Sequence, residues 1–288
     1  MGVTRRGKLW TGIGTAVLVG AGAANADLDT DGVPTSASAP LALAFADMTV
    51  PPGGEGEGSG GEGEGGEGGE GGGEFGVDPE EARTDPVPFG IALDIIRAHY
   101  LAGQAAYAAG DREAAGELFL HPISEVYVAM EPVFADLGIA PFEALMAKTG
   151  DLALSGAALA DVKKAVAAVL SATDNAEQAA PAGALSRATL DAEVIADMVE
   201  RAALQYQIVA GGAVGAAYLD GYGFAAAARL RADRSLAAIA RDNADLAQAI
   251  RMAMEVLAGA YPTAVQPDPL KTDVAAVLAA SSRLRLAL

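Results

Sequence analysis

IALDIIRAHYLAGQAAYAAGDREAAGELFLHPISE, residues 91–125, is the stretch that decides the fold. Within it, Ile95, His99 and Gly103 recur every four positions, which is the spacing of one face of an α-helix. The surrounding residues are mostly alanine, leucine and isoleucine, and no run alternates between apolar and polar residues as a strand would. The stretch therefore begins with a long helix.

A turn and a second helix follow. Gly110 suits the left-handed position after a helix, and Asp111 suits the N-cap of the next helix, which extends to about Leu120. Pro122 disfavours helical geometry at His121. We therefore predict that the second helix ends at His121 and that a third helix starts at the proline.

The whole chain extends this pattern. It has 288 residues, of which 51% are hydrophobic and only 5% aromatic, and much of the hydrophobic fraction is alanine, a strong helix former with a small side chain. We predict an all-α fold, an antiparallel bundle of about eight helices in two halves, 86–180 and 181–288. Beyond the third helix, helices are expected at 141–149, 156–178, 190–210 (capped by Thr189), 215–232, 235–260 and 270–286.

The N-terminal part has a different composition. Residues 1–26 combine Arg5, Arg6 and Lys8 with an apolar stretch and end in Ala-Asn-Ala, the pattern of a cleaved signal peptide. Residues 27–85 include a run rich in glycine and glutamate, which predicts a disordered acidic segment. We expect a periplasmic or secreted protein whose mature chain does not insert into a membrane.

Charge and composition exclude several functions. The formal net charge is −19 and there is no cysteine, so a nucleic-acid partner, a thiolate metal site and a cysteine nucleophile are not expected. Ser124 lies near His121 without the G-x-S-x-G context of a hydrolase. An enzyme is therefore the less favoured class.

The only two histidines are the candidate site. His99 lies eleven residues before Gly110 and His121 lies eleven residues after it. In an antiparallel hairpin both would lie about 15 Å from the turn, at the same level. Glu125, one turn further on, could fold back toward them, and two imidazoles with one carboxylate form a common set of ligands for Fe, Zn or Cu(II). We predict a metal site made by His99, His121 and Glu125.

Two other interpretations stay open for these residues. His121 and Glu125 could simply form a helix junction, because a glutamate in a first turn favours the helix dipole. The two histidines could also ligate a noncovalently bound haem from both sides.

Two segments resemble known families. LAGQAAYAAGDREAAGELF, residues 101–119, resembles a tetratricopeptide-type hairpin, which supports the pairing of the histidines. ALQYQIVAGGAVGAAYLDGYGFAAAARLR, residues 203–231, resembles a segment of the periplasmic helical domains of bacterial high-affinity iron uptake systems, the iron permease-associated and imelysin-like group. Alternatively, its aromatic residues Tyr206, Tyr218, Tyr222 and Phe224 are core residues at helical spacing.

Together these features predict an exported metal-binding protein. The resemblance implies a role in iron or other transition-metal acquisition, with a periplasmic or membrane transport protein as a partner. The alternative is a helical scaffold or interaction module that binds no small ligand.

Overall fold

The computed structural model describes residues 76–212 and 215–288. The elements are α1 (Pro79–Ala82), α2 (Pro86–Ala109), α3 (Arg112–Pro122), the π-helix η1 (Ile123–Tyr127), α4 (Val128–Asp136), α5 (Glu143–Leu154), α6 (Leu159–Gln178), α7 (Arg187–Ala210), α8 (Ala216–Asp242), α9 (Ala244–Ala260) and α10 (Val274–Arg285). The predicted signal peptide and most of the predicted acidic segment lie outside the described residues.

The prediction of an all-α bundle is confirmed. The described residues contain no strand, and if α3, η1 and α4 are counted as one continuous helix, eight helices have seven residues or more. Gly110 adopts the predicted left-handed conformation, with φ 95°, and the Asp111 carboxylate accepts a hydrogen bond from the Ala114 N–H as an N-cap. The hairpin formed by α2 and α3 therefore follows the sequence signals.

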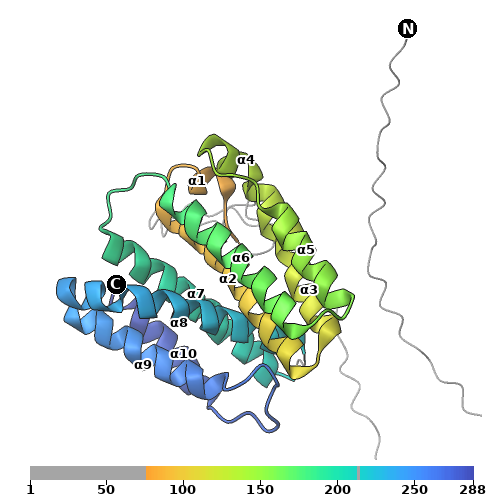
Figure 1. Cartoon of the computed structure of the whole chain (residues 1–288). Coiled ribbons are helices and arrows are strands. Elements are labelled where there is room, and N and C mark those ends of the chain that lie inside the picture. The colour runs from red at the N-terminus through yellow and green to blue at the C-terminus, as the bar shows by residue number, and fades with distance from the viewer. Residues whose placement is uncertain (1–75, 213–214) are drawn as a thin grey trace, which may run out of the picture. The chain divides into compact units, whose positions relative to one another are not determined.

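Helix α2 lies at the centre of the fold. It contacts α3 and α6 of the N-terminal half and also α7 and α8 of the C-terminal half. Figure 1 shows α3 to α6 on one side of the molecule and α7 to α10 on the other. The packing of α2 against α8 thus joins the two halves.

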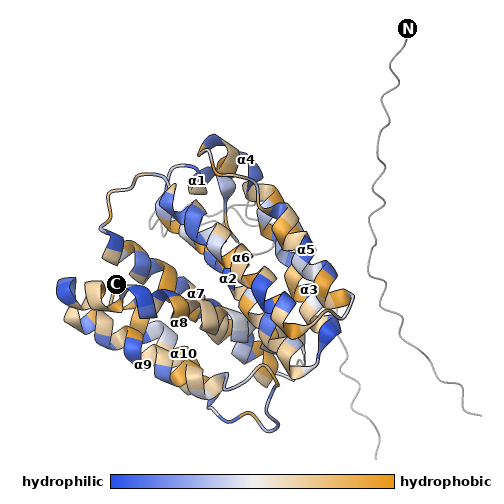
Figure 2. Cartoon of the chain, in the orientation of Figure 1, coloured by the Kyte–Doolittle hydropathy of each residue, from blue (hydrophilic) through white to orange (hydrophobic). Residues whose placement is uncertain are grey.

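The core combines many alanines with a few aromatic clusters. Tyr127, Phe134 and Phe142 stack with ring centroids 4.8–5.6 Å apart in the N-terminal half, and Tyr206 and Tyr261 do so at 5.4 Å in the C-terminal half. Figure 2 shows hydrophilic residues interspersed with hydrophobic ones along the helices. Among the described residues, no helix is long and apolar enough to cross a membrane.

Two glycines allow α2 to approach its neighbours closely. A Cβ atom on Gly103 of α2 would lie 2.6 Å from the Phe119 ring of α3. A Cβ atom on Gly223 of α8 would lie 2.5 Å from the Ala98 carbonyl oxygen of α2. The second contact involves backbone, which cannot rotate away, so Gly223 sets the distance between α2 and α8.

Several predicted boundaries are wrong. The helix does not break at His121. Instead, α3 continues through Pro122 and passes directly into the wider π-helix η1. Ser186, rather than Thr189, caps α7, since its hydroxyl accepts a hydrogen bond from the Thr189 N–H. The predicted break between residues 232 and 235 is absent: α8 runs without interruption from Ala216 to Asp242.

The start of the fold and the start of the helix after α8 also differ from the prediction. The described fold begins before Pro86, since α1 buries Ala82 completely and Arg83 forms an ion pair with Asp136. The helix that follows α8 is capped by Asn243, whose side chain accepts a hydrogen bond from the Leu246 N–H.

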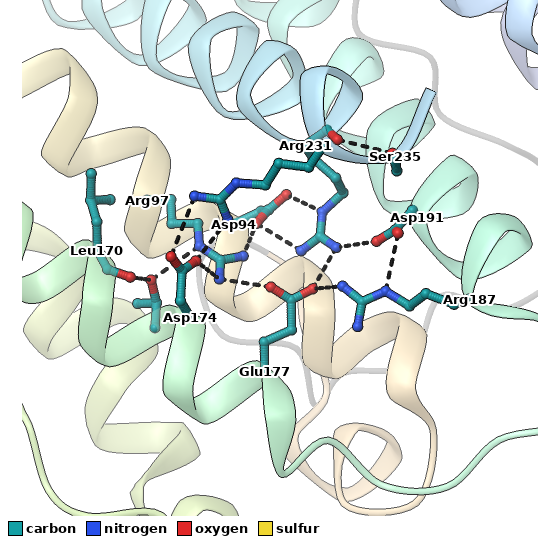
Figure 3. Close-up of polar contacts among 11 residues, drawn as sticks. Asp94, Arg97, Leu170, Asp174, Glu177, Arg187, Asp191, Arg231 and Ser235 are labelled. Atoms are coloured by element: carbon teal, nitrogen blue, oxygen red, sulfur yellow. Dashed lines mark hydrogen bonds and ion pairs between the residues drawn. The ribbon is translucent and has the colours of Figure 1, made fainter. Parts of the chain in front are cut away.

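A buried carboxylate connects α2 to α8. Asp94 is only 1% exposed and accepts hydrogen bonds from Arg97 Nη1 at 2.6 Å and from Arg231 Nε and Nη2 at 2.7 and 2.9 Å. Figure 3 shows the Arg231 guanidinium facing Asp94 in this arrangement. Each charge lies opposite its partner, which offsets the cost of removing it from water.

Further carboxylates extend this contact to two more helices. Glu177 of α6 accepts hydrogen bonds from Arg97 and Arg231 at 2.7 and 2.6 Å, and Asp191 of α7 accepts one from Arg231 at 2.6 Å. Four helices therefore meet at one set of charges (Figure 3). We call the complete set the arginine network: Asp94, Arg97, Asp174, Glu177, Arg187, Asp191, Arg231 and Arg234.

We predict that Gly223→Ala lowers the free energy of unfolding by about 1–3 kcal/mol, because the new methyl group overlaps the Ala98 carbonyl oxygen. Chemical denaturation followed by circular dichroism measures this change. Gly259→Ala is the matched control, since its Cβ atom would meet only the Thr272 hydroxyl, at 3.1 Å. An equal or smaller loss for Gly223→Ala than for the control would contradict the close approach.

We also predict a specific loss of stability in acid. Burial by itself would raise the pKa of Glu177, but the charges of Arg231 and Arg97 outweigh it and hold the pKa at about 2, below the ordinary 4.5. A lowered carboxylate pKa stabilises the fold above pH 4.5, and this stabilisation is lost as the pH falls toward 2. We expect a loss on the order of 3 kcal/mol over this range.

Denaturation at a series of pH values measures this loss. Glu177→Gln should be less stable than the wild type at pH 7 and should lose less stability between pH 4.5 and pH 2. Glu255→Gln, at an exposed position of α9, should keep the wild-type slope. Parallel slopes for the wild type and Glu177→Gln would show that the arginines do not hold this carboxylate in its charged form.

Candidate functional site

His99 is buried in α2, with 2% of its surface exposed. Its Nδ1 atom lies 2.8 Å from the Ile95 carbonyl oxygen. A carbonyl oxygen only accepts hydrogen bonds, so Nδ1 carries the proton of the neutral ring and Nε2 keeps its lone pair. This is the tautomer in which a histidine binds a metal through Nε2 while a backbone carbonyl orients the ring.

The surroundings keep His99 neutral. Burial lowers the pKa of His99 to about 4, and the charge of His121 adds to the decrease, whereas the hydrogen bond to Ile95 opposes it. The ring also contacts Phe224 of α8 edge-on, with centroids 6.2 Å apart. At neutral pH, the His99 ring is therefore neutral and held in a fixed orientation.

His121 and Glu125 lie on either side of Pro122. The proline lacks an N–H group, and just after it the helix widens, so that the Val128 N–H donates to the Ile123 carbonyl five residues earlier. His121 is exposed and Glu125 is half-buried. A π-helical turn of this kind often occurs where a helix presents functional side chains.

Asp220 adds a carboxylate from α8. It is half-buried in the second turn of that helix. Burial raises the pKa of Asp220 to about 6, with His121 opposing the rise and Glu125 adding to it. Asp220 therefore lies within electrostatic range of both residues.

Four side chains from four elements thus share one electrostatic environment. We call His99, His121, Glu125 and Asp220 the histidine cluster. The effect of His121 on the pKa of His99 shows that the hairpin brings the two histidines near each other. Glu125 adds to the raised pKa of Asp220, a residue that the prediction did not include.

The cluster is not a closed set of metal ligands. Among the described residues, no three His, Cys, Asp or Glu side chains are placed to hold one metal ion. The cluster does supply the right donor atoms, since it combines two imidazoles with two carboxylates. Its most exposed member is His121.

Sequence reasoning missed Asp220 and the arginine network. Asp220 lies within the stretch AAYLDGYGF, residues 216–224, as the single charge among apolar and aromatic residues. Asp94 and Arg97 interrupt the apolar stretch of α2 in the same way. A charged residue on an apolar helical face was the signal that could have pointed to both clusters.

The aromatic residues of 203–231 are packing residues. Tyr206, Tyr218 and Phe224 are buried, and the two tyrosine hydroxyls donate to the carbonyl oxygens of Thr272 and Thr263 at 2.9 and 2.8 Å. These hydrogen bonds attach the segment between α9 and α10 to α7 and α8. Tyr222 is only half-buried.

Comparison with known proteins adds no relative. No protein-family model, curated protein or solved structure matches this chain. The case for function therefore depends on the site.

Proposed function

We propose that this chain is an exported metal-binding protein that holds one transition-metal ion at the histidine cluster. The observation that carries the proposal is the buried, neutral ring of His99, which the Ile95 carbonyl holds in a fixed orientation within electrostatic range of His121. The nearby His121, Glu125 and Asp220 supply further nitrogen and oxygen donors. The partial resemblance to periplasmic iron-uptake domains supports the same class of function.

Each residue has a distinct role in this proposal. His99 is the fixed ligand, because the Ile95 carbonyl and the Phe224 ring hold its orientation. His121 is the mobile ligand: it is exposed at the end of α3 and turns toward His99 when the metal enters. Glu125 and Asp220 provide carboxylate ligands and neutralise the charge of the ion.

The donor set restricts the identity of the metal. Two imidazoles with carboxylates and no sulfur suit Fe, Zn or Cu(II) and disfavour Cu(I), which prefers thiolate and thioether ligands. The metal is cargo in this proposal, and the protein passes it to a periplasmic or membrane transport protein. Export rests on the signal-like residues 1–26.

We predict that the purified protein binds Fe(II), Zn(II) or Cu(II) with a stoichiometry near one and that His121→Ala weakens binding at least tenfold. His121 is the informative position because its exposed side chain contributes little to packing. Asp220→Asn keeps the shape of the residue and should also weaken binding, since an amide is a poorer ligand than a carboxylate. Elemental analysis and isothermal titration calorimetry measure both effects.

The control for these variants is Glu143→Gln, an exposed carboxylate in the first turn of α5. It should bind metal as the wild type does. Unchanged stoichiometry and affinity in the His121→Ala and Asp220→Asn variants would show that the metal does not bind at the histidine cluster. Absence of binding by the wild type, after reconstitution with all three metals, would favour the helix junction and the scaffold alternative.

A further inference from the structure

A separate cavity of about 300 Å³ opens at the arginine network. Residues of α2, α6, α7 and α8 line it, so it lies where the two halves of the fold meet. Its volume is at the lower end of the range for small-molecule sites. None of the residues of the histidine cluster lines it.

The inner surface of the cavity is rigid and charged. Arg97 and Arg231 are buried, and Asp94 holds both in place. Every carboxylate oxygen of the lining residues Asp94, Glu177 and Asp191 already accepts a hydrogen bond from an arginine. These carboxylates are thus largely committed as acceptors, so a cationic ligand would have to compete with the arginines for them.

The outer part of the cavity offers spare donors. Arg187 and Arg234 have side chains 59% and 50% exposed. Arg187 uses Nε on Asp191 and Nη2 on Glu177, and Arg234 uses Nη1 and Nη2 on Asp174. Three of the five N–H donors of each guanidinium therefore make no hydrogen bond to the described part of the chain.

One wall of the cavity is apolar. Ala227, Leu230 and Ala238 lie on the face of α8 that also carries Arg231 and Arg234. A ligand that contacts this wall and the outer arginines must combine an apolar body with an anionic group. The planar guanidinium matches a carboxylate in geometry, because two of its parallel N–H groups can donate to the two carboxylate oxygens at once.

We propose that this cavity binds a small organic carboxylate, with its anionic group on Arg187 and Arg234 and its apolar body on the wall formed by α8. The surplus of N–H donors at the opening recognises the anion, while the paired charges at the inner end supply a preformed, rigid floor. The proposal is independent of metal binding at the histidine cluster.

The test is a titration of the full protein with benzoate, followed by the NMR signals of the arginine Nε–H groups. Benzamide, which has the same apolar body without the charge, and sodium chloride at equal ionic strength are the controls. We expect benzoate to shift the arginine signals in a saturable manner and benzamide to leave them in place. Equal shifts with benzamide or with salt would overturn the proposal.

Variants localise the effect. Arg187→Gln with Arg234→Gln should weaken benzoate binding at least tenfold, whereas Arg229→Gln, at an exposed arginine outside the lining, should stay within twofold of the wild type. Ala238→Phe fills the cavity without removing a charge and should abolish binding, which tests the site even if the double variant does not fold. Wild-type affinity in Ala238→Phe, or tighter binding of inorganic phosphate than of benzoate, would overturn the assignment.

Discussion

The carboxylate of Asp94 is the centre on which the rest of the structure depends. It is buried, and it binds one arginine of its own helix and one arginine 137 positions later in the chain. Removing one partner from such a buried group typically costs 3–5 kcal/mol, since the other charge is left without compensation. An alanine-rich core offers little shape by which helices can recognise one another, and the directional arginine–carboxylate contacts supply that recognition instead.

The register set by this contact determines where the histidine cluster forms. Asp94 meets Arg231, and one turn further along α2 the Ala98 carbonyl meets Gly223, so α2 and α8 run antiparallel. Asp220 lies three residues before Gly223 in α8, on the side of this contact that leads toward the C-terminal end of α2. The position of the acidic residue thus results from the packing of α2 against α8, while the hairpin at Gly110 independently places His121.

The sequence contained the local signals of this fold but few of the long-range ones. The first helix, the turn at Gly110, the cap at Asp111 and the buried Tyr206, Tyr218 and Phe224 all followed from spacing and from known residue preferences. The proximity of the two histidines followed from the same hairpin. Whether they hold a metal is a question of chemistry that helical spacing alone does not answer.

The boundaries that were mispredicted have local physical causes. Pro122 was expected to end a helix, but a π-turn accommodates the missing N–H group and the helix continues. The N-cap of α7 was predicted at Thr189. The actual N-cap is Ser186, three residues earlier, whose hydroxyl accepts a hydrogen bond from the Thr189 N–H. Capping residues are frequent in this chain, and spacing alone does not decide which one a helix uses.

The pairing of Asp94 with Arg231 was outside the reach of sequence reasoning for a different reason. Each residue has ordinary partners nearby, such as Arg97 for Asp94, and nothing in the local sequence selects a partner on a distant helix. The selection occurs only when α2 and α8 approach as closely as Gly223 permits.

The two candidate sites differ in how their polar groups are balanced. In the arginine network the carboxylate oxygens facing the cavity all accept hydrogen bonds from arginines, so the inner part of the cavity is stable without a ligand. Only the N–H donors of the outer arginines remain to bind a ligand. The histidine cluster combines two imidazoles with two carboxylates, and burial raises the pKa of Asp220 to about 6, with Glu125 adding to the rise and His121 opposing it. A cation beside Asp220 would offset the cost of burying its negative charge, whereas the same cation at the arginine network would have to displace guanidinium groups already in place. This difference is the reason for proposing a metal ion at the histidine cluster and an anion at the outer part of the arginine network.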